Sequence, residues 1–129
     1  MIEPIWIQRL ALELLHDESL AEHGGSSGLR DEGLLESALA RPRNLHTYEG
    51  VSDLARPAAS YAFGLAKNHP FVDGNKRAAF IAATLFMRLN GTPVKADQVD
   101  AYKRMIALAA GEIGEEEFAA WLRENVKPR

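Results

Sequence analysis

The segment from Ala78 to Leu89 constrains the fold of this chain more than any other part of the sequence. Only Thr84 and Arg88 are polar among its residues, so a helix here is apolar on nearly every side. Such a helix belongs inside a protein, because any surface position would expose apolar side chains to water. Asn90-Gly91-Thr92-Pro93 follows, with the residues typical of a helix cap and a stop. We therefore expect a buried helix at the centre of a helical bundle.

Five further segments are expected to form helices around this central one. In the first three, apolar residues recur at steps of three and four, which indicates a helix with one buried face. The last two begin with acidic residues, which stabilise the N-terminal end of a helix. The chain is thus predicted to be all-α, with six helices and short links. The five flanking segments are residues 4–23, 31–41, 53–68, 97–110 and 115–126.

Three local patterns give sharper predictions. Gly24-Gly25-Ser26-Ser27-Gly28 indicates a stop and a flexible turn. The second helix should end before Pro42, because the residue that precedes a proline avoids helical geometry. Arg41–Ser52 is then a long surface loop of the kind that often serves recognition. In the first helix, the residues that recur on the expected buried face are Ile7, Leu10, Ala11, Leu14 and Leu15.

Composition narrows the class of protein. The chain has 129 residues, 47% of them hydrophobic and 26% charged, which predicts one globular domain spanning residues 1–129. It has no cysteine, so disulfides and thiolate metal sites are excluded. Its net charge of -3 argues against a nucleic-acid-binding protein. Met1–Trp6 lacks the positive start of a signal peptide, and Ala78–Met87 is too short to cross a bilayer, so we expect a cytoplasmic protein.

A polar cluster, residues 69–77 with the sequence His-Pro-Phe-Val-Asp-Gly-Asn-Lys-Arg, directly precedes the apolar run; we call it the motif. The start of a helix carries free N–H groups and a partial positive charge, which favour an anion such as phosphate. Gly74 lets the backbone approach a ligand closely, and Asn75 can cap the helix or donate its amide to phosphate. Lys76 offers a mobile charge and Arg77 a planar fork for phosphate oxygens.

The first half of the motif supplies groups suited to catalysis. His69 has the pKa range of a general base for an incoming hydroxyl. Asp73 offers the single carboxylate that Mg²⁺ takes from a protein when nucleotide phosphates and water fill its other positions. Phe71 is expected to be an apolar plug. Each residue alone has an ordinary structural explanation as a turn or a cap, but their combination against a buried helix favours a functional site.

The other histidines, His16, His23 and His46, have no such neighbours in the sequence and are expected at the surface. The motif is not a phosphate-binding P-loop, which has a longer glycine-bounded loop and Ser or Thr after its lysine.

At these residues the chain resembles the Fic superfamily, whose signature reads His-x-Phe-x-Asp/Glu-Gly-Asn-Gly-Arg, with a second arginine after two intervening residues. Lys76 stands where that signature has its second glycine, and Phe80 stands where it has its second arginine. At both positions the chain resembles the Doc (death-on-curing) toxins, whose motif reads His-x-Phe-x-Asp-x-Asn-Lys-Arg. The similarity extends over most of the chain and implies a compact Fic-type bundle with its buried central helix after the motif.

The resemblance implies a specific reaction. Fic enzymes generally transfer AMP from ATP to a protein hydroxyl, whereas Doc toxins bind ATP in reverse and act as protein kinases on a threonine of elongation factor Tu, which arrests translation. His69 would then be the base, Asp73 the Mg²⁺ ligand, and Asn75, Lys76 and Arg77 the phosphate grip. An AMP transferase and a catalytically idle antitoxin-binding module are the alternatives.

The resemblance also implies two interactions with other proteins. Doc toxins are silenced by an antitoxin similar to Phd, whose disordered tail folds into a groove on the toxin. The loop Arg41–Ser52 would correspond to the flap that aligns the target in Fic proteins, with Tyr48 or its neighbours touching the substrate. The sequence leaves open the target, the antitoxin and its stoichiometry, and the oligomeric state.

Overall fold

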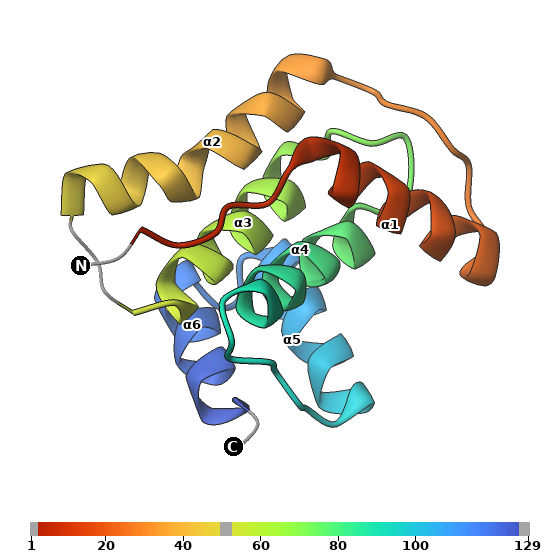
Figure 1. Cartoon of the computed structure of the whole chain (residues 1–129). Helices are drawn as coiled ribbons and strands as arrows, with labels where there is room; N and C mark the ends of the chain where they lie inside the picture. Colours follow the sequence, from red (N-terminus) through yellow and green to blue (C-terminus); the bar gives the residue numbers. More distant parts are fainter. Residues whose placement is uncertain (1–2, 50–52, 127–129) are drawn as a thin grey trace.

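Six helices form the regular secondary structure of residues 3–49 and 53–126, which the computed structural model describes (Figure 1). This part of the chain contains no strand, only isolated bridges that pair Leu29 with Phe71 and Val94 with Val126. None of its helices is both long and apolar enough to cross a membrane. The predicted all-α architecture with six helices is confirmed. The helices are α1 (Arg9–His23), α2 (Glu32–Glu49), α3 (Ala55–Asn68), α4 (Asn75–Leu89), α5 (Gln98–Ala110) and α6 (Glu115–Glu124).

Helix α4 is the buried central helix that the sequence predicts. It packs against α1, α3 and α5. Four alanines and Phe86 on α4 are completely buried, which places apolar contacts on several sides of the helix. The helix begins at Asn75, so the last three residues of the motif form its first turn. The position of this polar turn is therefore fixed by the burial of the helix behind it.

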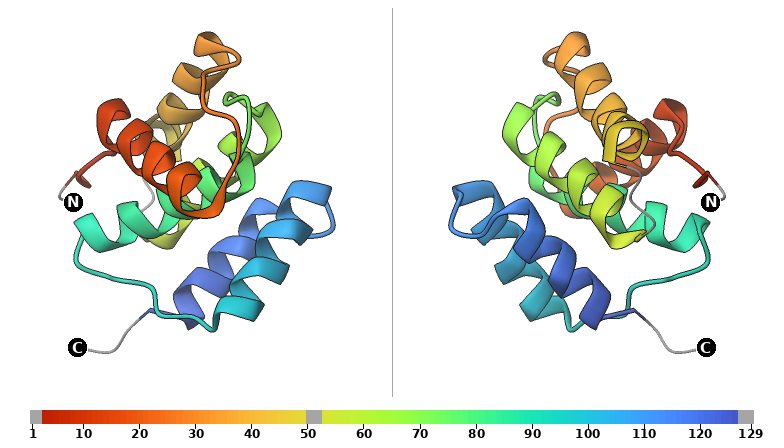
Figure 2. Two further views of the ribbon diagram at one scale, coloured as in Figure 1. Left: turned by 90° about the vertical axis from the view of Figure 1, so that its right-hand side faces the viewer. Right: turned by 90° about the vertical axis from the view of Figure 1, so that its left-hand side faces the viewer.

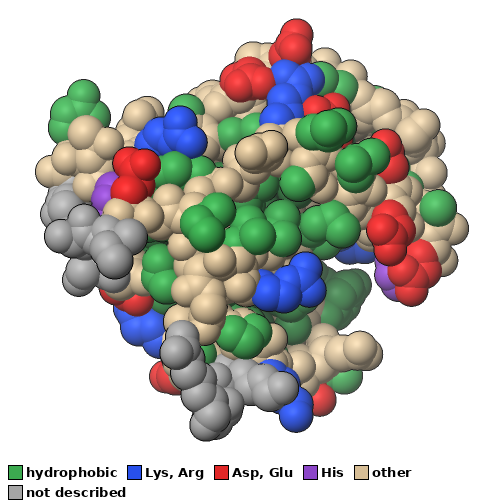
Figure 3. All heavy atoms as spheres, viewed as in Figure 1, with side chains coloured by type: hydrophobic (Ala, Val, Ile, Leu, Met, Phe, Trp, Pro, Cys, Tyr) green, Lys and Arg blue, Asp and Glu red, His purple; other side chains and the backbone are tan. Residues whose placement is uncertain are grey.

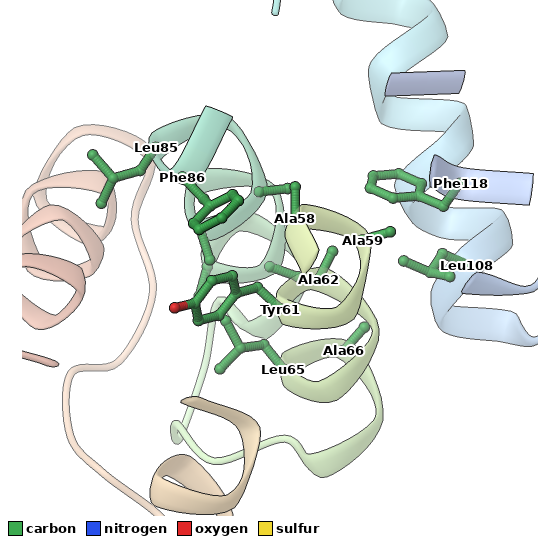
Figure 4. Close-up of a cluster of buried hydrophobic side chains, with 14 of the residues drawn as sticks. Ala58, Ala59, Tyr61, Ala62, Leu65, Ala66, Leu85, Phe86, Leu108 and Phe118 are labelled. Atoms are coloured by element: carbon green, nitrogen blue, oxygen red, sulfur yellow. The ribbon is translucent and has the colours of Figure 1, made fainter. Parts of the chain in front are cut away.

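Small side chains on α3 let helices approach it closely from two sides. Figure 4 shows Ala59 and Ala66 pointing toward Phe118 of α6 and Leu108 of α5. On the other side of α3, the ring of Tyr61 lies 5.5 Å from that of Phe86 on α4. The core thus continues from α4 through α3 to the last two helices.

Helices α5 and α6 lie side by side beneath α3 and α4 (Figure 2). Asp97 caps α5, because its carboxylate accepts the N–H of Asp100 at 3.0 Å. Asp100 in turn accepts the indole N–H of Trp121 on α6 at 2.7 Å. Polar contacts at the start of α5 therefore add to the apolar packing that holds the pair together.

The buried face of α1 differs from the predicted one. Leu10 and Leu14 are 67% and 59% exposed, whereas Leu12, His16 and Leu20 are buried. Compared with the prediction, the helix is rotated about its axis. The residues that pack against its neighbours are spaced by four, at positions 12, 16 and 20, and one of them is a histidine. Of the predicted residues, Ile7 is buried and Leu15 packs against the core, so the prediction was wrong at Leu10 and Leu14.

The predicted end of the second helix is also wrong, since α2 continues through Pro42 to Glu49. Pro42 is fully buried, and packing of its ring favours the helix that its missing N–H would weaken. Residues beyond it are also held: the Arg43 guanidinium lies 5.7 Å from the Trp6 ring, and the His46 ring packs edge-on against Trp6 at 5.6 Å. Most of the expected loop Arg41–Ser52 is thus helical, and residues 50–52 lie outside the described part of the chain.

Helices α2 and α3 pack closely at Gly64. A Cβ atom at Gly64 would lie 3.3 Å from the Cα of Ala38, which is tighter than ordinary contact with backbone. We predict that Gly64→Val lowers the unfolding free energy by about 1–3 kcal/mol through overpacking, as measured by urea denaturation. Ala40→Val, at an exposed position of α2, is the control and should lower it by less than about 0.7 kcal/mol. Equal losses in both variants would contradict the prediction.

Candidate active site

A hollow of about 1070 Å³ lies between α1, α4 and α5. Figure 3 shows it as a recess between the part of the surface that contains α1 and the part that contains α5, with apolar side chains inside. One end of the hollow is mainly apolar and is bordered by residues such as Phe80, Ile81 and Met105, although Arg88 and Lys95 also line the hollow. The other end is polar and contains the predicted site residues His69, Asp73, Gly74, Asn75, Lys76 and Arg77.

His69 begins the motif in an unusual backbone conformation. It is the C-cap of α3, with φ 50° and ψ 55°, and it is the one residue other than glycine with positive φ among residues 3–49 and 53–126. This left-handed conformation costs a non-glycine residue about 1–3 kcal/mol, so the surrounding structure has to impose it. The turn directs the chain out of α3 and leaves the side chain exposed at the hollow.

An extended segment, residues 24–31, pairs with the motif along its backbone. The N–H of Val72 donates to the carbonyl of Gly28 at 3.0 Å. The N–H groups of Arg30 and Asp31 both donate to the carbonyl of Pro70, at 2.7 and 3.0 Å. The glycine-rich stretch that the sequence suggested was a flexible turn therefore begins a segment that is held against the backbone of the motif.

Asn75 holds the motif loop closed. Its side-chain Oδ1 accepts the N–H of Phe71 and its Nδ2 donates to the carbonyl of Phe71, both at 3.0 Å. The side chain is buried, at 8% exposed. Asn75 thus fixes the loop onto the first turn of α4, and the further prediction that its amide reaches phosphate stays a prediction.

Asp73 is held as a carboxylate by backbone N–H groups. One oxygen accepts from Ser26 at 3.2 Å, and the other accepts from Gly74 at 2.8 Å. These hydrogen bonds, that from Ser26 foremost, hold the pKa of Asp73 below its usual value, and the charge of Arg77 acts in the same direction. With its pKa lowered, the group is ionised at neutral pH, and its side chain is exposed to solvent.

His16 contradicts the prediction that it lies at the surface. It is 2% exposed, and its ring stacks on that of Phe71 with centroids 3.9 Å apart. Its Nε2 lies 2.8 Å from the carbonyl oxygen of Asp73 and therefore carries the proton, because a carbonyl only accepts. His46 is also partly buried, whereas His23 is exposed as predicted. The four-residue spacing of Leu12, His16 and Leu20 was the signal that could have revealed the buried histidine.

The backbone conformation of residue 74 and its closeness to the His16 ring both favour glycine at this position. It has φ 74°, a conformation that favours glycine, and it precedes the first residue of α4. A Cβ atom at this position would lie 3.1 Å from Nε2 of His16. No side chain caps α4 here, so the N–H groups of its first turn are available to an anion.

The two cations of the motif have different surroundings. Arg77 donates to the carbonyl of Gly24 at 3.0 Å and lies near that of Ser19, so its charge is balanced by the C-terminal end of α1. This contact supplies part of the compensation that the sequence assigned to a bound anion. Lys76 is exposed, and it takes part in none of the ion pairs of the described residues.

The closure of the motif by Asn75 can be tested by stability. Asn75→Ala leaves the buried N–H of Phe71 without its acceptor, and we predict a loss of about 1–3 kcal/mol in the unfolding free energy. Asn44→Ala, at an exposed position of α2, is the matched control and should change it by less than about 0.5 kcal/mol. Urea denaturation followed by circular dichroism measures both, and an unchanged Asn75→Ala variant would refute the assignment.

The pKa of Asp73 gives a prediction about pH. Because folding lowers this pKa, the ionised carboxylate stabilises the folded state fully above the unfolded pKa of about 3.9. That stabilisation is lost as the pH falls through the lower, folded-state pKa. The difference in unfolding free energy between the wild type and Asp73→Asn should therefore shrink between about pH 5 and about pH 2. Urea denaturation at a series of pH values measures it, and a constant difference would disprove this role.

Comparison with known proteins agrees with this geometry. Residues 6–87, which contain the whole motif, match the model of the Fic/DOC family. Protein kinase doc of Escherichia phage P1 is 36% identical over 109 residues, which cover 84% of this chain and 86% of that protein. Toxin Doc of Mycolicibacterium smegmatis is 43% identical over 75 residues, which cover 57% of this chain and 58% of that protein. With its motif at the start of a buried helix, this chain belongs to the Fic/DOC family and to its Doc branch.

Proposed function

We propose that this protein is the toxin of a toxin-antitoxin pair and that it transfers the γ-phosphate of ATP to a serine or threonine hydroxyl of a protein. The observation that carries the proposal is the meeting of an imidazole, a carboxylate and two cations in one hollow at the start of α4. The names of the two relatives, a protein kinase and a toxin, support it. Elongation factor Tu is the first target to test, because the Doc toxins that this chain resembles act on it.

The residues divide the reaction between them. His69 accepts the proton of the target hydroxyl while the hydroxyl oxygen forms its bond to the γ-phosphorus. The bond between that phosphorus and the bridging oxygen of ATP breaks, and ADP leaves. Lys76 and the free N–H groups of α4 hold the phosphates, and Arg77 contributes the donors that its contacts with α1 do not use. Positioning and charge stabilisation of this kind account for most of the catalysis in phosphoryl transfer.

A magnesium ion fits the donor set near Asp73. The carboxylate is exposed and is kept ionised by its hydrogen bonds. The described residues hold no cluster of three or more histidines, cysteines or acidic side chains that could bind a metal alone. Mg²⁺ typically takes one carboxylate from a protein and its remaining ligands from phosphates and water. Asp73 would hold the ion, which would neutralise phosphate charge when bound.

Two residues favour a kinase over an AMP transferase. Phe80 lies on the wall of the hollow, at the position where the AMP-transferring enzymes have a second arginine. Because phenylalanine is apolar, the phosphates of ATP would have no arginine to bind at this point of α4. Lys76 stands at the position of the second glycine of their signature and adds a positive charge within the motif. Both differences favour placing the terminal phosphate beside His69.

The apolar end of the hollow suits the antitoxin. Tyr102 and Ile106 of α5 are 68% and 36% exposed, and they border the hollow opposite Phe80 and Ile81 of α4. An amphipathic helix could bury these side chains in a groove. We therefore propose that the tail of a Phd-like antitoxin, disordered when free, binds here as a helix.

The position of the transferred label tests the reaction. Purified protein incubated with cell extract should label its target from ATP carrying radioactive phosphorus at the γ position and not from ATP labelled at the α position. His69→Ala should lower this transfer by about 10²–10⁴-fold and abolish toxicity, because the general base is lost. Label from the α position would indicate an AMP transferase, and a toxic His69→Ala variant would indicate a module that only binds.

Lys76→Ala tests the phosphate grip in the same assay. It should raise the KM for ATP, whereas Lys103→Ala should not, because Lys103 is exposed on α5 and does not border the hollow.

A further inference from the structure

We propose that Arg30 is a positioning residue for catalysis, which holds the backbone of His69 in the conformation that directs its imidazole. The inference rests on the proposed role of His69 as general base. Arg30 lies 39 positions before His69, outside the motif, in the extended segment that pairs with it.

The guanidinium of Arg30 binds the end of α3 at two points. Its Nε donates to the carbonyl of His69 at 2.6 Å, and its Nη2 donates to the carbonyl of Asn68 at 2.7 Å. The backbone N–H of Arg30 adds a third contact, to the carbonyl of Pro70 at 2.7 Å. Three consecutive carbonyls, of residues 68, 69 and 70, are therefore fixed by one residue. The planar fork of arginine suits this geometry, and lysine cannot reproduce it.

His69 needs such a restraint. Its left-handed conformation is unfavourable for a residue with a side chain, and the alternative is a backbone that continues helical or extended. Its imidazole is exposed, so packing does not fix the direction of the ring. The carbonyls of residues 68 and 69 belong to the C-terminal end of α3, where a cation is also favoured by the helix dipole. Arg30 therefore restrains the backbone from which the imidazole projects.

Arg30 acts through the backbone and not on the substrate. It is not among the residues that border the hollow, whereas His69 is. Arg30 is also exposed, so its removal leaves no cavity. The backbone pairing of residues 28–31 with the motif does not use its side chain, so a substitution removes the two guanidinium bonds and leaves the segment in place.

The test compares Arg30→Met and Arg30→Lys with the wild type. Methionine keeps much of the length of the arginine side chain but has no hydrogen-bond donor. Lysine keeps the positive charge but lacks the planar guanidinium group that binds two carbonyls. We expect kcat for phosphate transfer to fall by about 10- to 100-fold in both variants, which is the effect of a small misplacement of a catalytic group, with the KM for ATP unchanged. Guanidinium ion at a non-denaturing concentration should restore part of the activity of Arg30→Ala, and sodium ion at equal ionic strength should not.

Arg123→Met is the matched control, because Arg123 is an exposed arginine that pairs with Asp53 far from the motif in sequence. It should keep the kcat of the wild type. An unchanged kcat in Arg30→Met, or an equal loss in Arg123→Met, would overturn the proposal. So would a loss of activity that follows the unfolded fraction of Arg30→Met measured by circular dichroism.

A second readout does not depend on activity. The NMR signals of the His69 ring should move in both Arg30→Met and Arg30→Lys, and should stay at their wild-type positions in Arg123→Met. Unchanged His69 signals in the Arg30 variants would overturn the positioning role whatever the protein catalyses. If the wild type transfers no phosphate while these signals move, the proposed function fails and the restraint on His69 stands.

Discussion

The burial of α4 is the constraint on which the rest of the structure depends. This helix packs against α1, α3 and α5, and any rotation or shift along its axis would expose apolar surface. Its first turn, Asn75 to Arg77, therefore has one position in the bundle. Because the helix is buried, the N–H groups at its start and its positive end point in a fixed direction. A loosely packed surface helix would not fix that direction.

The loop that joins α3 to α4 is restrained by side chains from three directions. His16 contacts it from α1, Asn75 closes it from α4, and Arg30 holds its first residues from the extended segment. These contacts are made largely to backbone carbonyl and N–H groups, so they set the path of the chain and leave the side chains of His69 and Asp73 exposed. A loop with few such contacts would sample several conformations and would not hold the backbone of His69 and Asp73 in one position.

Charge in the site is balanced partly within the protein. Arg77 lies at the carbonyl end of α1, which offsets the unfavourable position of a cation at the start of α4. Asp73 accepts two backbone N–H groups and remains ionised. Lys76, by contrast, is exposed and takes part in none of the ion pairs of the described residues.

Local sequence patterns decided a large part of this protein. The apolar run of residues 78–89 determined the buried helix, Asp97 marked the start of α5, and the order of residues in the motif placed an imidazole, a carboxylate and two cations beside a helix start. These features follow from the preferences of single residues and from the periodicity of a helix, which act over a few positions. They are therefore readable before any tertiary contact is known.

Only the tertiary structure decided which surfaces meet. Pro42 stays within α2 because its ring is buried, and α1 turns His16 inward because Phe71 and the carbonyl of Asp73 lie there to receive it. The partner of Arg30 is likewise 39 residues away. Burial and long-range hydrogen bonds depend on the neighbour that the fold supplies, and these energies exceed the local preferences that a sequence pattern records.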